Sequence, residues 1–432
     1  MTGPTGPAHR RLGDGPRSPS PGVRVVLDAR PLQAPERAPL AAAYLDGLLG
    51  AFDADPLSGE SFAFLIGSDA DDPTVGFAHL DVVGRRQLPP TRLLRSGALT
   101  VDPFVLRGAT LGATWRAERR GAAGAVYHAV GSGPLPIGSA LPVVVTLLDL
   151  APWELPEAFQ RSPASRFGQR LRAQLLREAA AVIVGSEATA QATRRLLRIR
   201  RDRLHVVRMA PRAGFGPPSA TAGPRAMLVR DRFGLNGRYL VFSGRFDARL
   251  DLSTMLAALA TLAAAGRPHE LEEDVPWPPR ILLVGASPDD RASLARAAAR
   301  KGIGGSLVYV PALPVTDLVE LVRAARGAVL PVLSEGAGLP VIEALACGTP
   351  VVASAVGPLP ELVGPAGLLV EPHDPDRLAV ALATIWADDE VHARLASVAR
   401  VRAEGDVRTW ADVARETRTI YATVGVRRED RV

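Results

Sequence analysis

The sequence predicts an α/β protein made of two domains, each with a parallel sheet covered by helices. The chain has 432 residues, which exceeds the usual size of a single hydrophobic core. Short apolar runs alternate with longer helical patterns in both halves, and this alternation is typical of parallel sheets. A stretch rich in Pro, Gly and Ala, from Pro211 to Pro224, separates the halves and predicts an interdomain linker.

Composition narrows the class of protein. Apolar residues make up 47% of the chain, yet no apolar run approaches the ~20 residues that cross a bilayer, and the first residues lack the apolar core of a signal peptide. We therefore expect a cytoplasmic protein. The formal charge is +6, but basic residues are dispersed among acidic ones, so nucleic acid is not an expected partner. The single cysteine, Cys347, excludes an internal disulfide and is expected to pack as a small apolar residue rather than act as a nucleophile.

The N-terminal domain is expected over residues 23–210. Residues 1–22 precede it and are rich in Pro, Gly, Ser and Arg, so we expect a disordered tail. An apolar run beginning at Val23 predicts the first buried strand. The strands expected after it lie at Phe62–Ile66, Ala125–His128, the start of Leu141–Phe159, Ala180–Thr189 and His205–Val207. Helices are expected at Asp102–Arg120, Arg166–Glu178 and before Arg203.

A linker at residues 211–225 and a C-terminal domain at residues 226–405 follow. Its expected strands are Tyr239–Phe242, Ile281–Val284, Leu307–Val310 and Ala328–Pro331, with helices at Leu252–Ala264, Arg291–Lys301 and Thr316–Ala325. The stretch Gly367–Leu382 predicts a hairpin-like return and then a helix capped near Asp374. A last helix, Thr409–Val424, lies within residues 406–432. No G-x-G-x-x-G motif follows a strand, which disfavours a nicotinamide or flavin oxidoreductase.

The most informative stretch is SEGAGLPVIEALACGTPVVAS, from Ser334 to Ser354. It predicts a glycine-containing loop that opens into a helix near Pro340, because proline is favoured at a helix start. Free backbone N–H groups there can bind a phosphate or a sugar oxygen. The carboxylate of Glu343 can accept two hydrogen bonds from a vicinal diol such as a ribose, with Glu335 near the other end of the same ligand. A less favoured alternative is a buried helix whose glutamates merely face water.

This stretch resembles the signature of the retaining glycosyltransferases of the GT-B fold, in particular the family-four (glycosyl transferases group 1) type, whose two glutamates are separated by seven residues. The resemblance implies two Rossmann-like domains with parallel sheets facing each other across a cleft. The last helix, with Trp410 and Tyr421, would cross back onto the N-terminal domain. The resemblance spans Val23 to about Val424 and is stronger in the second domain.

The resemblance also implies roles for individual residues. Arg245, in SGRFDARLDL, matches the arginine that contacts the donor phosphates, and Arg249 matches a second basic position. Glu335 would bind the sugar hydroxyls, Glu343 the ribose, and Asp149 would lie on the acceptor side. The backbone expected to contact phosphate and sugar is that of Gly336, Ala337, Gly338 and Leu339. GT-B enzymes generally act without a bound metal, and neither a metal nor a cofactor is expected here.

Three positions depart from the family pattern. The stretch from Gln33 to Tyr44 has no glycine where the family has a glycine loop, Leu148 replaces a histidine, and Leu250 replaces a lysine. Losing one preorganised electrostatic contact typically costs about 3 kcal/mol of barrier.

The favoured hypothesis is a transferase that moves a sugar from a nucleoside-diphosphate sugar to an acceptor hydroxyl. The alternative is a catalytically weakened relative that binds a nucleotide sugar and acts as a scaffold or regulatory subunit; a GT-B epimerase or phosphorylase is a weaker third reading.

The acceptor side of the resemblance is less specific. A glycan or a lipid-linked acceptor is implied, and arginines gather on Arg166–Glu178 and on the RRLLRIRRDR run at Arg194–Arg203. Such basic helices can lie on an anionic membrane surface, which would place the protein peripherally at the inner face of the membrane. A solvated helix face is the favoured reading of the same pattern.

Overall fold

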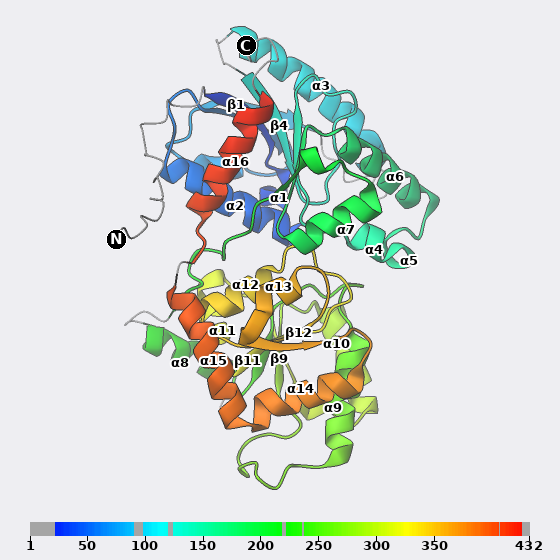
Figure 1. The fold of residues 1–432 in the computed structure, drawn as a ribbon, viewed down its shortest axis with the longest axis vertical. Coiled ribbons are helices and arrows are strands. Elements are labelled where there is room, and N and C mark those ends of the chain that lie inside the picture. The colour runs from blue at the N-terminus through cyan, green and yellow to red at the C-terminus, as the bar shows by residue number, and fades with distance from the viewer. Residues whose placement is uncertain are drawn as a thin grey trace, which may run out of the picture.

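The computed structural model describes residues 22–89, 98–119, 124–217, 222–235, 237–405 and 407–425. These residues form two α/β domains, one above the other in Figure 1. Each domain has one sheet in which every strand pair is parallel, as the strand and helix alternation predicts.

The N-terminal sheet has seven strands in the order β3-β2-β1-β4-β5-β6-β7. They are β1 Val23–Asp28, β2 Ser61–Gly67, β3 Val82–Leu88, β4 Gly124–Val130, β5 Val143–Thr146, β6 Ala181–Val184 and β7 Leu204–Val206. The helices of this half are α1 Arg30–Gln33, α2 Pro39–Ala54, α3 Ala98–Arg119, α4 Ala151–Glu154, α5 Pro156–Phe159, α6 Pro163–Glu178 and α7 Glu187–Leu197.

The C-terminal sheet has six strands in the order β10-β9-β8-β11-β12-β13. They are β8 Leu240–Phe242, β9 Ile281–Val284, β10 Leu307–Val310, β11 Gly327–Leu330, β12 Val351–Ser354 and β13 Gly367–Val370. The helices are α8 Ala222–Arg232, α9 Leu252–Ala265, α10 Pro288–Arg300, α11 Val315–Ala324, α12 Leu339–Ala346, α13 Leu359–Val363, α14 Pro375–Ala387 and α15 Asp389–Glu404.

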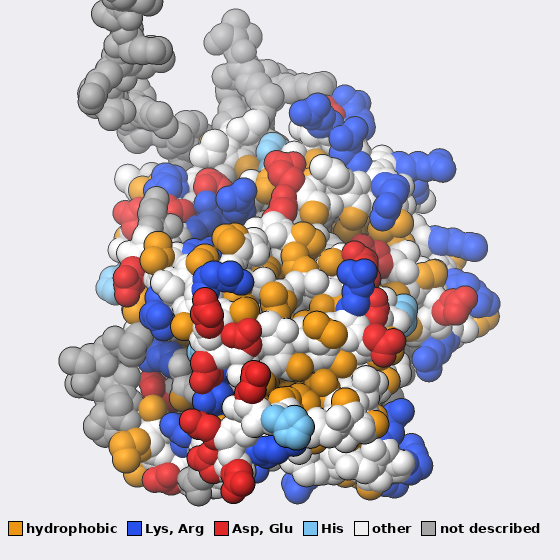
Figure 2. Space-filling view, turned by 60° about the horizontal axis from the view of Figure 1, so that its bottom comes forward, with side chains coloured by type: hydrophobic (Ala, Val, Ile, Leu, Met, Phe, Trp, Pro, Cys, Tyr) orange, Lys and Arg blue, Asp and Glu red, His pale blue; other side chains and the backbone are white. Residues whose placement is uncertain are grey.

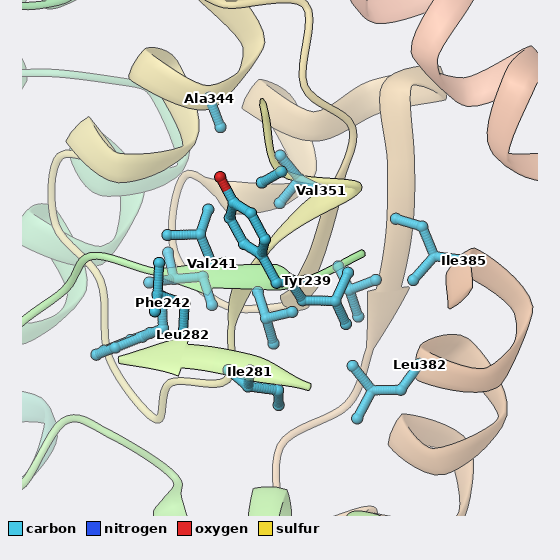
Figure 3. Packing of buried hydrophobic residues seen from close by; sticks show 14 of the residues in the cluster. Tyr239, Val241, Phe242, Ile281, Leu282, Ala344, Val351, Leu382 and Ile385 are labelled. Atoms are coloured by element: carbon cyan, nitrogen blue, oxygen red, sulfur yellow. The ribbon is translucent and has the colours of Figure 1, made fainter. Parts of the chain in front are cut away.

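The core of this second domain lies where helices cover the sheet. Strands β8 and β9 are buried along their whole length, as expected for central strands covered on both faces. Tyr239 stands among Val241, Leu282 and Ala344 in Figure 3, and its hydroxyl donates to the carbonyl of Leu321 at 2.9 Å. The hydroxyl is therefore satisfied although its ring is buried.

Helix α16, Trp410–Gly425, returns to the N-terminal domain and packs against α2, β1 and β4 (Figure 1). The ring of Trp410 meets Tyr44 edge to face at 5.5 Å between centroids. The Tyr421 hydroxyl lies 2.6 Å from Nδ1 of buried His128, whose other ring nitrogen lies 2.9 Å from the Thr146 hydroxyl. Burial lowers the pKa of His128 to about 3, so the ring is neutral and can hydrogen-bond through both nitrogens.

Some expectations differ from the structure. The expected hairpin-like return is wrong, because β13 pairs with β12 in parallel and α13 provides the crossover between them. The last four residues of the expected linker belong to α8, which packs on α11. The loop expected after the strand at Leu141 contains α4 and α5, and the run ending at Thr189 is a strand only as far as Val184. The sequence interpretation also missed α2 and β3. Residues 1–21 of the expected tail, and Arg120, lie outside the described residues.

Figure 2 shows a face on which basic and acidic side chains are interspersed, with apolar side chains between them. Among the helices in the described part of the chain, none combines the length and the apolar character needed to span a bilayer.

Candidate functional site

A cavity of about 240 Å³ lies between the two domains. The C-terminal domain contributes residues at the carboxyl ends of β8, β9, β10 and β11, and the N-terminal domain contributes Pro39, Leu40 and Ala43 at the start of α2. Carboxyl ends of neighbouring parallel strands gather at one edge of a sheet, where α/β proteins bind ligands. Of the residues predicted to form a site, the cavity wall contains Arg245, Arg249, Glu335, Leu339 and Glu343.

The loop before α12 is shaped by its glycines. Gly338 precedes the helix with φ of 70°, a conformation that favours glycine, and Pro340 occupies the second helical position rather than the first. At Gly336 an added Cβ would lie 2.2 Å from the carbonyl oxygen of Leu148, at the end of β5. The glycine therefore allows the loop of one domain to touch the backbone of the other.

The carboxylate of Glu335 turns back onto its own loop. Its Oε1 accepts hydrogen bonds from the N–H groups of Gly336 and Ala337, both at 3.2 Å, and of Gly338, at 2.8 Å. Burial raises the pKa of Glu335, and the N–H groups of Gly338 and Ala337 partly offset that increase. These are the N–H groups that the sequence assigned to a ligand, so a ligand that takes them must displace the Glu335 carboxylate.

Glu343 is held by a residue that the sequence interpretation missed. Arg212, in the interdomain connection, donates through Nε to Oε1 at 2.5 Å and through Nη2 to Oε2 at 2.9 Å. The Glu343 side chain is 3% exposed and that of Arg212 is 29% exposed. Burial raises the pKa of Glu343, and Arg212 acts against this increase. The only signal in the sequence was an arginine within a stretch interpreted as a linker.

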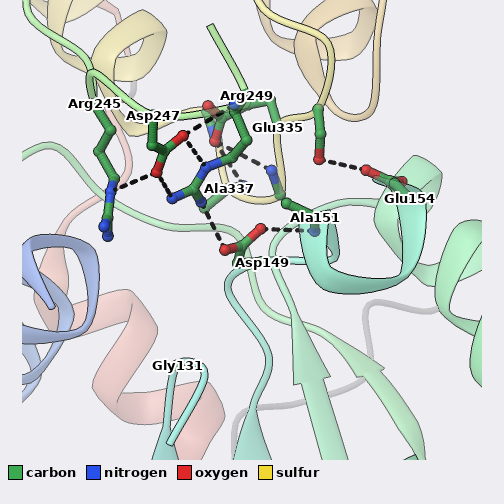
Figure 4. A network of polar contacts seen from close by, with 12 residues as sticks. Gly131, Asp149, Ala151, Glu154, Arg245, Asp247, Arg249, Glu335 and Ala337 are labelled. Carbon is green, nitrogen blue, oxygen red and sulfur yellow. Dashed lines mark hydrogen bonds and ion pairs between the residues drawn. The ribbon is translucent and has the colours of Figure 1, made fainter. Parts of the chain in front are cut away.

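Arginine and aspartate alternate at the mouth of the cavity (Figure 4). Arg249 bonds Asp247 through Nε and Nη2, at 3.0 and 2.5 Å, and reaches Asp149 of the other domain at 2.6 Å. Burial alone lowers the pKa of Arg249, but the bonds to Asp247 and the charge of Asp149 raise it overall. Arg245 is 45% exposed and contacts Asp247 at 3.1 Å, so Arg245 is the more available cation.

Two further hydrogen bonds join the domains beside this network. The Ser334 hydroxyl donates to Glu154 of α4 at 2.5 Å, and the Thr189 hydroxyl of α7 donates to the carbonyl of Gly336 at 2.9 Å. Together with the pair between Arg249 and Asp149, these contacts bring the signature loop against the N-terminal domain. The structure therefore holds the two domains closed around the cavity.

Comparisons with known proteins support the fold. Residues 230–402 match the family model described as Glycosyl transferases group 1. A sucrose-phosphate synthase from Thermosynechococcus elongatus has a similar structure, with a TM-score of 0.66 and 21% identity over 93% of this chain and 98% of that one. Anabaena HepE, solved in complex with UDP, gives 0.64 and 18% identity over 93% of this chain and 99% of that chain. The chain has the GT-B fold, and most of its C-terminal domain matches the glycosyl transferases group 1 model.

Curated relatives of this GT-B protein carry transferase names. The Escherichia coli O-antigen chain mannosyltransferase B is 27% identical over 64% of this chain and 69% of its own length. A D-inositol 3-phosphate glycosyltransferase from Xylanimonas cellulosilytica is 31% identical over 65% of this chain and 64% of its own length. The chain thus spans about two thirds of the length of these curated relatives.

The three departures from the GT-B family pattern have different structural consequences. Leu250 is buried in the C-terminal core and bridges Val332, while its neighbour Arg249 lines the cavity. Leu148 is 2% exposed and packs with Ala337 and Leu339 of the signature. Among the residues that the structure describes, no histidine lines the cavity. In place of a glycine loop, the first turn of α2 borders the cavity.

Neither an activated thiol nor a metal-binding cluster is found among the described residues of this region. Cys347 is buried, and burial raises the pKa of its thiol to about 11, so it is protonated at neutral pH. Within the described residues, no cluster of three or more His, Cys, Asp or Glu side chains is arranged to hold a metal ion.

Proposed function

We propose that this GT-B protein transfers a sugar from a nucleoside-diphosphate sugar to an acceptor hydroxyl with retention of anomeric configuration. The observation that carries the proposal is the interdomain cavity, whose wall combines both signature glutamates with Arg245 and Arg249. The mannosyltransferase name of one relative supports a hexose as the transferred group. The donor is itself the activated substrate, so the proposed reaction needs no cofactor.

The diphosphate leaving group would lie beside Arg245. Negative charge grows on that group as the glycosidic bond breaks, and fixed cations in a closed site stabilise it. Of Arg245 and Arg249, Arg245 has the more exposed guanidinium and, among the residues the structure describes, a single carboxylate partner at 3.1 Å. Arg249 is bound by two aspartates, so its role is to hold Asp149 and Asp247 in place and to add positive charge at the cavity wall.

The two glutamates would bind the ends of the donor. In this proposal Glu343 accepts hydrogen bonds from the ribose diol, and Glu335 accepts them from hydroxyls of the transferred sugar. Each oxygen of Glu343 accepts one hydrogen bond from Arg212, so further lone pairs of the carboxylate are left for the ribose diol. The loop bonds of Glu335 end on Oε1, which leaves Oε2 to accept from a sugar hydroxyl, whereas a donor oxygen that binds the N–H groups of Ala337 and Gly338 would have to displace Oε1.

Closure between the domains supports transfer over hydrolysis. The contacts of Ser334, Gly336 and Arg249 with the N-terminal domain hold the two domains together beside the cavity. Excluding water protects an activated donor and strengthens the electrostatic interactions inside the site. We expect slow donor hydrolysis when no acceptor is present.

A donor panel tests the proposal. Full-length protein is incubated with individual nucleoside-diphosphate hexoses, and release of the nucleoside diphosphate is measured with and without candidate glycans. Arg245→Gln should lower the rate by on the order of a hundredfold, and Glu343→Ala should weaken donor binding. Arg377→Gln, a control at an 80% exposed arginine with one carboxylate partner, should change neither. NMR of the product then assigns the anomeric configuration; an inverted product would contradict retention.

The scaffold alternative has one structural observation in its favour. Both signature carboxylates are already occupied, Glu343 by Arg212 and Glu335 by its own loop, so the cavity is satisfied without a donor. Saturable binding of nucleotide sugars with no turnover, across all donors and acceptors, would favour a binding or regulatory subunit. Turnover that depends on Arg245 would exclude the scaffold alternative.

We infer, more specifically, that the acceptor hydroxyl belongs to a lipid-linked molecule. Helices α3 and α6 pack together and leave Phe104 and Phe167 61% and 59% exposed, with Arg166 and Arg170 exposed on the same α6. Exposed aromatic and basic side chains suit an anionic membrane interface. Sedimentation with anionic vesicles should exceed that with neutral vesicles and should fall in Phe167→Ser. Equal sedimentation with both would argue against peripheral membrane contact.

A further inference from the structure

A second cavity, of about 460 Å³, lies where the chain passes between the domains. Both connections border it: the segment after β7, which contains Arg208 and Met209, and the segment before α16, which contains Val407 and Arg408. Arg408 donates through Nε to the backbone carbonyl of Arg208, so the two connections touch. We call this space the crossover cavity.

The floor of the crossover cavity is apolar. Ile342, Leu345 and Ala346 of α12 line it, together with Met209 and with Leu362 of α13. Helix α12 also lines the interdomain cavity of about 240 Å³, which we call the candidate donor cavity, but through a different set of side chains that includes Glu343. The crossover cavity is therefore a separate space that shares one helix with the candidate active site.

The rim of the crossover cavity is basic. Four arginines line it, at positions 208, 402, 408 and 415, and the only carboxylate in the described wall is that of Asp412. Asp412 pairs with Arg415 at 2.5 Å. Arg408 pairs with Glu416 of α16 at 2.6 Å. Two of the four cations are thus neutralised by carboxylates of α16.

The other two arginines, Arg208 and Arg402, line the same cavity without a carboxylate partner among the described residues. Arg402 of α15 donates to the carbonyl of Leu362, and within the described chain neither Arg402 nor Arg208 contacts a carboxylate. Burial lowers the pKa of Arg402, and the positive charge of Arg208 lowers it further. Both side chains are exposed, so an anion from solution can reach them, and a phosphate between them would relieve their mutual repulsion.

We propose that the crossover cavity binds a phosphorylated organic molecule, with its phosphate between Arg208 and Arg402 and its organic part on the floor formed by Met209, Ile342 and Leu345. Guanidinium groups bind phosphate oxygens in pairs, which suits two arginines from different segments. The volume of the cavity exceeds what inorganic phosphate fills. Because Arg208 follows the last strand of one domain and Arg402 belongs to the other, the ligand fixes the domains relative to each other.

Binding of this kind would regulate the candidate active site. The ligand would contact α12 on the face next to Glu343, and it would stabilise the closed arrangement by mass action in proportion to its concentration. The regulated property is the position of α12 relative to the N-terminal domain. Ligand binding in the crossover cavity does not require sugar transfer at the candidate active site.

Titration calorimetry tests the crossover cavity with three probes: inorganic phosphate, glucose 6-phosphate and adenosine monophosphate, with adenosine as the unphosphorylated control. The protein used is the full chain carrying Arg245→Gln and Glu343→Ala, which disable the candidate donor cavity. We expect at least one organic phosphate to bind more tightly than inorganic phosphate. Arg208→Gln or Arg402→Gln added to this background should weaken binding about tenfold or more, and Arg377→Gln should not.

The outcomes separate this proposal from the proposed function. Binding that survives loss of Arg245 and Glu343 but not of Arg208 supports the crossover cavity. Absence of binding by all three probes overturns it, as does binding that Arg208→Gln and Arg402→Gln leave unchanged. Because Arg208→Gln removes one of two like charges, its melting temperature without ligand should equal or exceed that of the parent, so lost binding cannot be attributed to unfolding.

Discussion

The pair between Arg212 and Glu343 makes a prediction that depends on which partner is removed. Arg212→Met keeps most of the apolar stem but leaves a carboxylate that is 3% exposed without a cation. Glu343→Gln leaves a guanidinium that is 29% exposed and can reach water, and the amide oxygen still accepts one hydrogen bond. The two substitutions break the same contact from opposite ends, so their costs can be compared directly.

The magnitudes follow from burial. Breaking a buried ion pair by removing one partner costs about 3–5 kcal/mol, because the remaining charge is left without compensation. For Arg212→Met we expect about 3 kcal/mol at neutral pH, the lower end of that range, because Arg212 is partly exposed. For Glu343→Gln we expect about 1 kcal/mol, the usual worth of a hydrogen bond whose partner can be solvated.

The pH dependence gives a second readout. Burial raises the pKa of Glu343 above its usual 4.5, so ionising Glu343 destabilises the folded state as the pH rises from 4.5 through the higher folded pKa. Removing Arg212 takes away the charge that holds this pKa down, and the folded pKa rises further. The stability gap between Arg212→Met and wild type should therefore be widest above about pH 7 and should close toward about pH 4.5.

Urea unfolding followed by tryptophan fluorescence, from about pH 5 to about pH 8, measures these differences. Arg225→Met is the matched control, because it breaks a pair with Asp317 in which the arginine is 53% exposed, and it should cost less than about 1 kcal/mol. Equal costs for Arg212→Met and Glu343→Gln, or a gap that does not vary with pH, would refute the reasoning from burial.

Three other substitutions probe the contacts around the site. Gly336→Ala places a Cβ 2.2 Å from the Leu148 carbonyl oxygen, so it should lower the free energy of unfolding by about 1–3 kcal/mol. It should also increase the radius of gyration in small-angle X-ray scattering, because the two domains must move apart. An unchanged scattering profile would contradict the close approach. Tyr421→Phe removes the hydrogen-bond partner of Nδ1 of buried His128 and should lower the free energy of unfolding by about 1–3 kcal/mol, measured in urea. Arg245→Gln should cost less than about 1 kcal/mol of stability, so a large loss would mean that Arg245 has a structural role.

The local sequence pattern was enough to predict the two parallel sheets and the loop that precedes α12. Strand and helix periodicity gave the two parallel sheets, and the Gly and Pro positions gave a loop that opens into α12. Gly338 adopts φ of 70° and Pro340 lies in the first turn, which are backbone constraints that residue type alone reveals. The direction of β13 is not encoded in this way, because a short strand reads the same in a hairpin and after a crossover.

Pairings across long separations could not be predicted. Arg212 lies 131 positions from Glu343, and Asp149 lies 100 positions from Arg249, so only the folded chain brings them together. The replaced lysine at Leu250 illustrates the same limit: the sequence suggests a missing cation, whereas the structure buries Leu250 in the core and directs Arg249 to the cavity. Arg249 belongs to a turn, whereas Leu250 forms a β-bridge with Val332 of the core.

The central claim is that the interdomain cavity binds the nucleoside diphosphate part of a sugar donor. Titration calorimetry with UDP, GDP and ADP on the full chain measures this directly. We predict that at least one of them binds saturably, about tenfold or more weakly in Arg245→Gln and in Glu343→Ala, and unchanged in Arg208→Gln. Absence of binding by all three, or binding that neither Arg245→Gln nor Glu343→Ala weakens, would contradict the account.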